Sequence, residues 1–251
     1  PSFAPNSGKL KLVSGAFMLP HPEKMAKGGE DAYFISDCGH VTGVADGVGG
    51  WAEVGVDAGA YSRLLMKNCQ GAAAKETVVE ESSPLRILKQ AYGQTHVQGS
   101  STACIVAMGN DTVHAANLGD SGLIIVRGER IIFKSPQQQH DFNFPFQLGS
   151  EAGMSDPPEA AAMFSVPVLE GDIVIMGTDG LFDNVFTDEI AHLAAVNKAG
   201  GADPAKSAKS IGTLAHVAAK DTEMMSPFGM AAQQVGFMFK GGKMDDITVV
   251  V

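Results

Sequence analysis

Acidic residues beside short apolar segments are the feature of this sequence that best indicates chemistry. Their positions are Glu30 and Asp31 at the end of a short strand, Asp46 before Gly47, Asp179 before Gly180, and the pair Asp245 and Asp246 near the end of the chain. A carboxylate at the end of a buried strand is costly unless it is paired or bound to a cation. Because no run of basic residues lies beside these acids, they predict a cluster that is filled by metal ions.

The residue types in this set suit hard divalent cations. Mg²⁺ and Mn²⁺ prefer carboxylate, carbonyl and water oxygens as ligands. Two such ions about 4 Å apart can share an aspartate and a water, which makes the water a nucleophile near neutral pH. The same ions neutralise charge on a phosphoryl group during in-line displacement. An Asp-Gly pair also lets a carbonyl or a phosphate approach closely, because glycine has no side chain.

Each acid taken alone is weak evidence. An Asp before Gly is more often a turn residue, and the segment that begins at Asp120 is by itself a β-turn sequence. Asp188 and Glu189 are typical of the first turn of a helix, where they favour the helix dipole. The ordered set of acids therefore carries the prediction, and no single member does.

Short β-rich runs predict the strands that must position these acids. The predicted strands are Lys11 to Phe17, Ala32 to Ser36, Val41 to Ala45, Ser101 to Met108, Thr112 to Asn117, Leu123 to Arg127, Arg130 to Phe133, Ala162 to Val168, Asp172 to Gly177 and Asp246 to Val251. Short turns join several of them, which favours an antiparallel arrangement.

Capping residues predict four helices. The predicted starts are Asp57, with a helix to about Ala74, Ser83-Pro84, Thr187-Asp188 and Asp203-Pro204. The stretch from Ser135 to Pro158 is interpreted as a long loop, and the stretch from Thr222 to Gly242 as irregular. No low-complexity linker interrupts the chain, so we expect residues 1–251 to form a single domain.

Composition narrows the function classes. The chain has 251 residues, of which 45% are apolar, and a formal net charge of -10 without any basic stripe, which argues against binding nucleic acid. Its three cysteines, Cys38, Cys69 and Cys104, form no CxxC motif, and we expect each to pack as a small apolar residue in a reducing, intracellular setting. No apolar stretch approaches the length of a membrane span. The chain opens at Pro1, so the sequence leaves open whether a targeting segment has been removed.

Six motifs give the sequence a family resemblance. GGEDAYFI, GVADGVGGW, GSSTACIVAM, ANLGDSGLIIV, GDIVIMGTDGLFDN and MDDITVVV resemble, in this order, the motifs of the metal-dependent (type 2C, PPM family) protein serine/threonine phosphatases. The resemblance runs from about Ser14 to Val251. The opening PHPEKMAKGGEDAYF is most similar to the compact organellar subgroup, which implies a mitochondrial or plastid location, with the cytoplasm as the alternative.

The resemblance implies a fold and a set of ligands. The fold is of the α+β class, a four-layer αββα sandwich in which two antiparallel β-sheets are flanked by helices. Asp46 would bridge two ions, with Glu30 and the Gly47 carbonyl on one ion and Asp179 and Asp245 on the other. Asp31 would act through an ordered water, and Asp120 and Asp183 would help to bind a third and weaker ion. Asp246 would contact the ligands without binding an ion itself. Asp46, Glu30 and Asp179 would be the catalytic set.

Two positions depart from the family pattern. Many members carry a phosphate-binding Arg four residues before the Glu of the first motif, where this chain has Ala26, and the candidate replacements are Lys24 and Lys27. A lysine cannot reproduce the bidentate contact of an arginine. Many members also carry a His after the Asp-Gly of the second motif, where this chain has Val48. The leaving oxygen would then be protonated by a metal-bound water or by another group, and the candidates are His21 and His140.

The resulting hypothesis is a phosphatase that hydrolyses phosphoserine and phosphothreonine in proteins. It would use a hydroxide activated by two Mg²⁺ or Mn²⁺ ions, form no phosphoenzyme and act as a monomer on phosphoprotein substrates. One alternative is a weakly catalytic member that docks phosphoproteins, and another is a metal-dependent phosphodiesterase or nuclease. In a third, the ions only stabilise the fold.

Overall fold

Two antiparallel sheets form the centre of the molecule. The computed structural model describes residues 10–76, 78–81, 83–150 and 155–251. Within them, one sheet has the strand order β1 (Ala16–Leu19), β14 (Ile247–Val250), β13 (Ile173–Gly177), β7 (Gly122–Arg127) and β8 (Arg130–Lys134). The other has the order β12 (Ala162–Pro167), β6 (Thr112–Leu118), β5 (Ala103–Met108), β3 (Val41–Asp46) and β2 (Asp31–Ile35). The first and the last strand of the described residues are therefore neighbours in one sheet.

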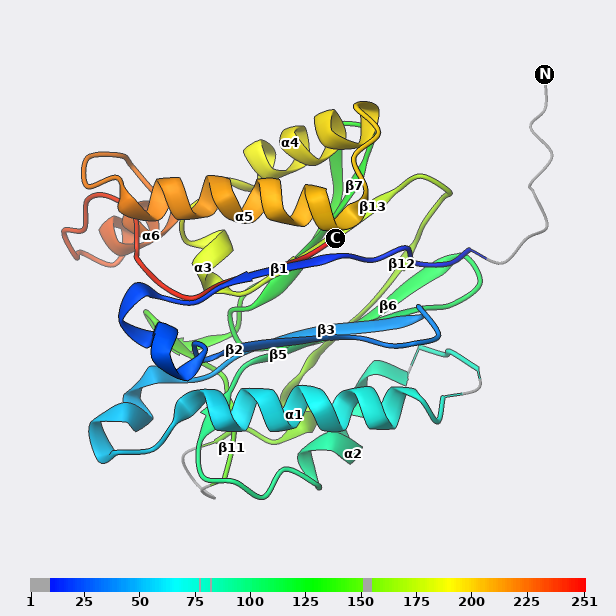
Figure 1. The fold of residues 1–251 in the computed structure, drawn as a ribbon, viewed down its shortest axis with the longest axis horizontal. Coiled ribbons are helices and arrows are strands. Elements are labelled where there is room, and N and C mark those ends of the chain that lie inside the picture. The colour runs from blue at the N-terminus through cyan, green and yellow to red at the C-terminus, as the bar shows by residue number, and fades with distance from the viewer. Residues whose placement is uncertain (1–9, 77, 82, 151–154) are drawn as a thin grey trace.

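Helices cover the outer face of each sheet (Figure 1). Helices α1 (Ala58–Ala73) and α2 (Ser83–Tyr92) pack on the sheet that contains β2, β3 and β5. Helices α4 (Thr187–Ala199) and α5 (Pro204–Lys220) pack on the sheet that contains β14 and β8. The order helix, sheet, sheet, helix confirms the predicted α+β, four-layer sandwich.

The burial of β5 shows why its sequence is apolar throughout. All six of its residues are buried, because both faces of the sheet are covered. Ile105 and Ala107 pack in the cluster beneath the sheet, with residues of α1, while Cys104 and Val106 pack in the cluster between the sheets. Alternate residues of a strand point to opposite faces, so one strand contributes to two of the three apolar layers.

The predicted helix starts are confirmed at the residues that cap them. Asp57 accepts a hydrogen bond from the Gly59 amide ahead of α1, and Asp203 accepts one from the Lys206 amide ahead of α5. Helix α4 begins at Thr187 as expected, although its first turn is closed by the Glu189 carboxylate, which accepts from the Phe186 amide at 3.3 Å.

Three sequence-based expectations need correction. The first strand is Ala16–Leu19, which is shorter at its start than predicted. Gly15 still pairs with Val251, but residues 10–14 form no strand. The stretch interpreted as irregular contains helix α6 (Pro227–Gln234), which the Ser226 side chain caps by accepting from the Gly229 amide.

The predicted long loop holds three very short strands, β9 (Gln139–Asp141), β10 (Phe144–Pro145) and β11 (Leu148–Gly149). β9 pairs with β10, whereas β11 pairs with β4 (Ser100–Ser101). Residues 151–154 of this stretch lie outside the described part. Short 3₁₀ helices that the sequence analysis did not predict are η1 (Pro22–Lys27), η2 (Gly49–Val54), and η3 (Pro158–Ala160).

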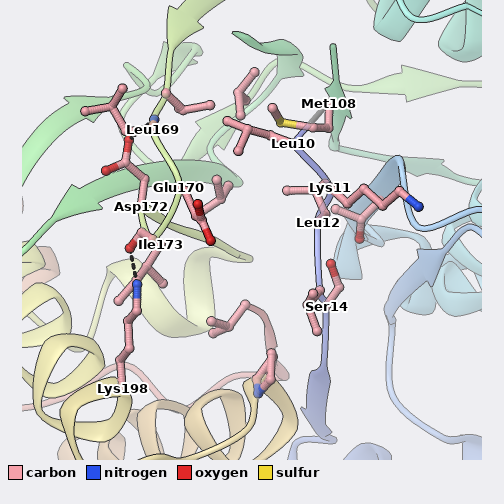
Figure 2. A pocket seen from close by; sticks show the side chains of 18 of the residues that line it. Leu10, Lys11, Leu12, Ser14, Met108, Leu169, Glu170, Asp172, Ile173 and Lys198 are labelled. Atoms are coloured by element: carbon pink, nitrogen blue, oxygen red, sulfur yellow. Dashed lines mark hydrogen bonds between the residues drawn. The ribbon is translucent and has the colours of Figure 1, made fainter. Parts of the chain in front are cut away.

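A groove of about 1500 Å³ lies where the N-terminal segment crosses the opening between the sheets. Figure 2 shows Leu10, Leu12 and Ser14 on one side of this groove and the loop from Leu169 to Ile173 on the other. None of the acids predicted to bind metal lines it. The groove is thus separate from the candidate site.

The cysteines differ from one another. Cys69 and Cys104 are buried, as expected for small apolar residues, but Cys38 is exposed in the turn between β2 and β3. All three are free thiols, in agreement with the predicted lack of disulfides. In the part of the chain that the structure describes, no helix is both long and apolar enough to cross a membrane.

Asp172→Asn is expected to lower the free energy of unfolding by about 1–2 kcal/mol at pH 7. The buried carboxylate accepts from Arg127 Nε at 2.9 Å and Nη2 at 2.7 Å, and from the Leu169 amide at 2.8 Å. Burial alone would raise the pKa of Asp172, but these donors outweigh it and the pKa is lowered. The stabilisation is therefore present above the unfolded-state pKa of about 3.9 and is lost as the pH falls through the folded pKa. Urea unfolding at several pH values measures this, and a difference that persists below the folded pKa would contradict it.

Candidate metal centre

Antiparallel pairing brings the first three predicted acids together. Asp31 opens β2 and lies directly opposite Asp46, the last residue of β3. The Glu30 carbonyl accepts a hydrogen bond from the Gly47 amide at 3.0 Å, which extends the pairing by one step. A side chain at Gly47 would not fit, since its Cβ would lie 2.6 Å from the Ala58 carbonyl oxygen. The Asp-Gly pair is thus a close-packed strand end.

The second sheet contributes acids from two neighbouring strand ends. Asp245 and Asp246 precede β14, and Asp179 follows the adjacent strand β13. Asp179 was expected at a strand end, but it is the first residue of the short helix α3 (Asp179–Phe182). The helix begins there because the Thr178 carbonyl accepts from the Leu181 amide at 3.1 Å.

A threonine connects the two sheets at the site. The Thr178 hydroxyl donates to Asp31 Oδ2 at 2.8 Å, although Thr178 follows β13 of one sheet and Asp31 opens β2 of the other. The Thr178 hydroxyl oxygen also accepts from the Thr248 amide at 3.2 Å. The sequence analysis did not identify Thr178, because its position beside Asp31 depends on how the sheets face each other.

Asp246 positions the chain around Glu30. Its side chain is 1% exposed and accepts from the His21 amide at 2.7 Å through Oδ1 and from the Glu30 amide at 3.0 Å through Oδ2. In Figure 1 the segment that includes η1 lies at the same end of the molecule as α6. These contacts are those of a group that holds a ligand-bearing loop, which is the role predicted for Asp246.

We expect Asp246→Asn to lower the free energy of unfolding by about 1–3 kcal/mol. Both carboxylate oxygens accept from backbone amides, so an asparagine must turn its NH₂ group toward either the His21 or the Glu30 N–H. One buried hydrogen bond is then lost. Urea denaturation of the chelated protein measures the change, with exposed Asp188→Asn as the control. Equal stability of the two variants would contradict this role.

Two lysines reach into the acid cluster. Lys24 Nζ lies 2.6 Å from Glu30 Oε2, 3.3 Å from Asp246 Oδ2 and 3.5 Å from Asp245 Oδ1. Lys243 Nζ pairs with Asp179 and lies 2.8 Å from Asp183 Oδ2 and 3.6 Å from Asp245 Oδ2. The sequence analysis searched for runs of basic residues and missed Lys243. In the sequence Lys243 is marked only by its position, two residues before Asp245.

Asp120 and Asp183 lie on the Asp179 side of the cluster. Burial raises the pKa of Asp120 to about 6 and that of Asp183 to about 7, and the Asp179 charge adds to both shifts. Asp120 Oδ2 also accepts from Gln139 Nε2 at 3.1 Å, a contact from the hairpin of β9 and β10. The structure thus brings both acids close to Asp179, whereas Lys27 is exposed at the end of η1.

Mutual repulsion between carboxylates is strongest around Asp46. Burial raises the pKa of Asp46 well above its usual range, and the charges of Asp179, Asp31 and Asp245 raise it further. Burial and the Asp246 charge raise the pKa of Asp31 in the same way. Burial would also raise the pKa of Asp179, but Lys243 outweighs it and the pKa is lowered. Cations are therefore needed for these groups to be ionised together.

The donor set fits divalent metal ions. Asp31 Oδ1 and Asp179 Oδ1 are buried without a hydrogen-bond partner, so each has a free position for a ligand bond. All predicted donors are carboxylate or carbonyl oxygens, which suit Mg²⁺ or Mn²⁺. Among the described residues, no three His, Cys, Asp or Glu side chains are arranged to hold an ion as they stand. Several carboxylates are instead directed at Lys24 and Lys243, so ion binding requires side-chain adjustment.

The two histidine candidates for the leaving-group acid differ in their contacts. His140 Nε2 lies 2.9 Å from Asp156 Oδ1, and its ring stacks on Phe146 with centroids 4.0 Å apart. His21 contacts the cluster directly, since its amide donates to Asp246, and its Nδ1 accepts from the Glu23 amide at 3.1 Å. The contact of the His21 ring is thus with its own 3₁₀ turn, whereas the His140 ring contacts Asp156, Phe144 and Phe146.

Sequence comparison identifies relatives along nearly the whole chain. No family model matches it. "Probable protein phosphatase 2C 55" of Arabidopsis thaliana is 51% identical over 243 residues, which cover 96% of this chain and 51% of that protein. "Protein phosphatase PTC7 homolog" of Danio rerio is 42% identical over 242 residues, with 89% of this chain and 80% of that protein covered. The chain spans 51% and 58% of the first two Arabidopsis relatives.

A solved structure agrees with these relatives. The photosystem II phosphatase PBCP matches with a TM-score of 0.86 and 35% identity, over 94% of this chain and 96% of that one. Both Arabidopsis relatives carry the name protein phosphatase 2C, and the match to PBCP covers nearly the whole chain. The chain therefore belongs to the protein phosphatase 2C family of metal-dependent phosphatases.

Proposed function

We propose that residues 1–251 form a single catalytic domain that removes phosphate from phosphoserine and phosphothreonine in proteins. The observation that carries this proposal is the acid cluster between the sheets, in which Asp31 Oδ1 and Asp179 Oδ1 are buried and unpartnered. Relatives named as protein phosphatases support the substrate class. Such a cluster suits phosphoryl transfer, because positioning and charge neutralisation supply most of the catalysis.

The proposed centre holds two Mg²⁺ or Mn²⁺ ions. Asp46 would bind both ions, and the other ligands divide into Glu30 and the Gly47 carbonyl for one ion and Asp179 and Asp245 for the other. Asp31 would act through ordered water. When bound, the ions supply Lewis acidity that activates water and neutralises the phosphoryl group. A structure similar in fold, the catalytic domain of PstP, is described as a complex with 2 manganese ions, which supports the count of two.

We infer that Lys24 is the phosphate contact in place of the family arginine. Its side chain is 31% exposed, so the ammonium can leave Glu30 for a substrate phosphate at the mouth of the site. Burial lowers the pKa of Lys24, but the hydrogen bond that Lys24 donates to Glu30 and the charges of Asp245 and Asp246 outweigh it. The raised pKa keeps the group charged at neutral pH.

Lys24→Met is expected to raise KM for a phosphothreonine peptide by roughly tenfold, the equivalent of about 1.4 kcal/mol of lost binding. Lys27→Met is the matched control, because Lys27 lies on the same 3₁₀ turn and is exposed. Steady-state kinetics in saturating Mn²⁺ measure both variants. A larger effect of Lys27→Met would reverse the assignment.

The proposed setting is organellar, with phosphoproteins as substrates and a monomeric chain. One similar structure is called a photosystem II phosphatase, which supports a plastid, and the similarity to a PTC7 homolog is compatible with an organelle. The net charge of -10 argues against nucleic acid as a partner. Size-exclusion chromatography with light scattering measures the oligomeric state, and a dimer would contradict the monomer.

The test of this function is phosphate release from a phosphothreonine peptide while Mn²⁺ is titrated in and then removed by a chelator. We expect saturable phosphate release that requires Mn²⁺. Hydrolysis of a phosphodiester substrate should be slower than hydrolysis of the peptide. Preference for the diester would favour the phosphodiesterase or nuclease alternative. Tight ion binding without release from any peptide would favour a protein that docks phosphoproteins.

A further inference from the structure

Lys243 occupies an unusual position for a lysine. Its side chain is 17% exposed and its ammonium lies among three acids of the cluster, paired with Asp179 and at 2.8 Å and 3.6 Å from Asp183 and Asp245. Buried lysines are rare unless they are paired. The ammonium is therefore paired with carboxylates from three different positions of the chain.

The backbone of Lys243 is fixed by a buried amide. The Lys243 amide donates to Asn184 Oδ1 at 2.8 Å, and Asn184 Nδ2 donates back to the Lys243 carbonyl at 2.8 Å. Asn184 Nδ2 also donates to the Gly180 carbonyl at 2.9 Å, so the same side chain ties Lys243 to helix α3. Asn184 is 0% exposed. This reciprocal pair of hydrogen bonds sets the direction in which the lysine leaves the chain.

An aromatic ring covers the other side of the ammonium. Lys243 Nζ lies 5.1 Å from the centroid of Phe228, which is itself 5.1 Å from the ring of Phe142. A cation over an aromatic face is attracted by the ring and is shielded from water. Three kinds of contact thus act on one side chain, namely carboxylates at its end, an amide at its backbone and a ring along its flank.

The acids divide into two groups by their distance from this cation. Asp179 and Asp183 contact Lys243 most closely, Asp245 lies farther away at 3.6 Å, and the charge of Lys243 also acts on Asp120. Glu30 instead pairs with Lys24. A divalent ion that bound Asp183 together with Asp179 would have to displace the ammonium, and breaking a buried ion pair is costly. An ion on the Glu30 side would meet no such competition from Lys243.

We propose that Lys243 is a built-in cation that takes the place of a third divalent ion beside Asp179 and Asp183, so that this chain holds a two-ion centre. The inference rests on the proposed metal centre and deepens it. The lysine is tethered, so unlike an ion it does not dissociate at low metal concentration. It orients the Asp179 carboxylate before the core ions bind.

Counting bound Mn²⁺ tests this inference without any activity assay. Equilibrium dialysis followed by elemental analysis is applied to the wild type, Lys243→Met, Lys243→Arg and the surface control Lys240→Met, whose lysine pairs with exposed Glu223. We expect about two ions per chain for the wild type and both controls. Lys243→Met should bind one more ion, with a dissociation constant at least tenfold lower than any third ion of the wild type. Purification in Mn²⁺ followed by gel filtration gives the same count if Lys243→Met unfolds without metal.

The outcomes separate this inference from the proposed function. Equal and nonzero counts for the wild type and Lys243→Met, with equal dissociation constants, would overturn the inference and leave the two-ion centre intact. A third ion bound equally by Lys243→Arg and Lys243→Met would also overturn it, because the charge would then be irrelevant. Absence of Mn²⁺ from every variant would overturn the proposed centre itself.

Discussion

Asp46→Asn is expected to reduce phosphopeptide hydrolysis by at least ~10³-fold while raising the melting temperature of the metal-free protein. Asp46 is the predicted ligand of both core ions, and an amide offers one neutral oxygen in place of two charged ones. Losing the positioning of the ions removes transition-state stabilisation of about 4 kcal/mol, which corresponds to this factor in rate. Initial rates with saturating Mn²⁺ measure the loss.

The opposite change in stability follows from the surroundings of Asp46. Its pKa is raised by burial and by the carboxylates of Asp179, Asp31 and Asp245, so the ionised form is unfavourable in the folded protein without metal. An asparagine of nearly the same shape removes that repulsion. With a chelator we expect the variant to have a higher melting temperature than the wild type. Adding Mn²⁺ should raise the melting temperature of the variant by less than it raises that of the wild type.

Asp188→Asn is the matched control for this experiment, since Asp188 is exposed in the first turn of α4. It should change neither the rate nor the response to Mn²⁺. The alternative in which the ions only stabilise the fold predicts a different pattern. In that case Asp46→Asn would melt earlier than the wild type in Mn²⁺ and would retain turnover wherever it stays folded.

The sequence predicted the fold well where the signals are local. Helices α1 and α5 begin at the capping residues Asp57 and Asp203, because a cap is a contact between residues two or three apart. The strands from β5 to β8 also lie close to their predicted bounds. Their turns are short and their apolar runs are continuous, so both ends of each strand are marked in the sequence.

The errors arise where tertiary contacts decide the structure. Asp179 follows a clear apolar strand, yet it begins α3, and that helix packs against β14, which is distant in sequence. Helix α6 lies in a stretch rich in Met and Phe whose apolar pattern has no helical period. The ring of Phe228 packs there against Phe142 and Phe239, so tertiary packing supports the helix.

The candidate site was predictable as a set of acids but not as a set of contacts. The order of the motifs placed the ligands, and the register of β2 on β3 then puts Asp31 opposite Asp46. Lys24 and Lys243 were a different case. Lys24 approaches Asp245 and Asp246, which are distant from it in the sequence. Lys243 likewise approaches the distant Asp179 and Asp183. Sequence spacing carries no information about such pairs.

Gly180→Ala is expected to lower the free energy of unfolding by about 3 kcal/mol or more and to weaken Mn²⁺ binding at the same time. A Cβ on Gly180 would lie 1.9 Å from the Asp246 carbonyl oxygen and 2.9 Å from its carbonyl carbon. These are backbone atoms at the start of a buried strand, so no change of rotamer can relieve the clash. Helix α3 must therefore move away from β14.

That movement links stability to the metal centre. Asp179 opens α3 and Asp245 precedes β14, so separating the two elements separates two predicted ligands of one ion. Urea unfolding and Mn²⁺ titration of Gly180→Ala measure the two effects. Gly50→Ala is the control, because no atom lies within 4 Å of a Cβ placed there and Gly50 has no positive φ. We expect that control to stay within about 0.5 kcal/mol of the wild type. If Gly180→Ala lost stability but bound Mn²⁺ as tightly as the control does, the close packing of α3 on β14 would not be what positions the ligands.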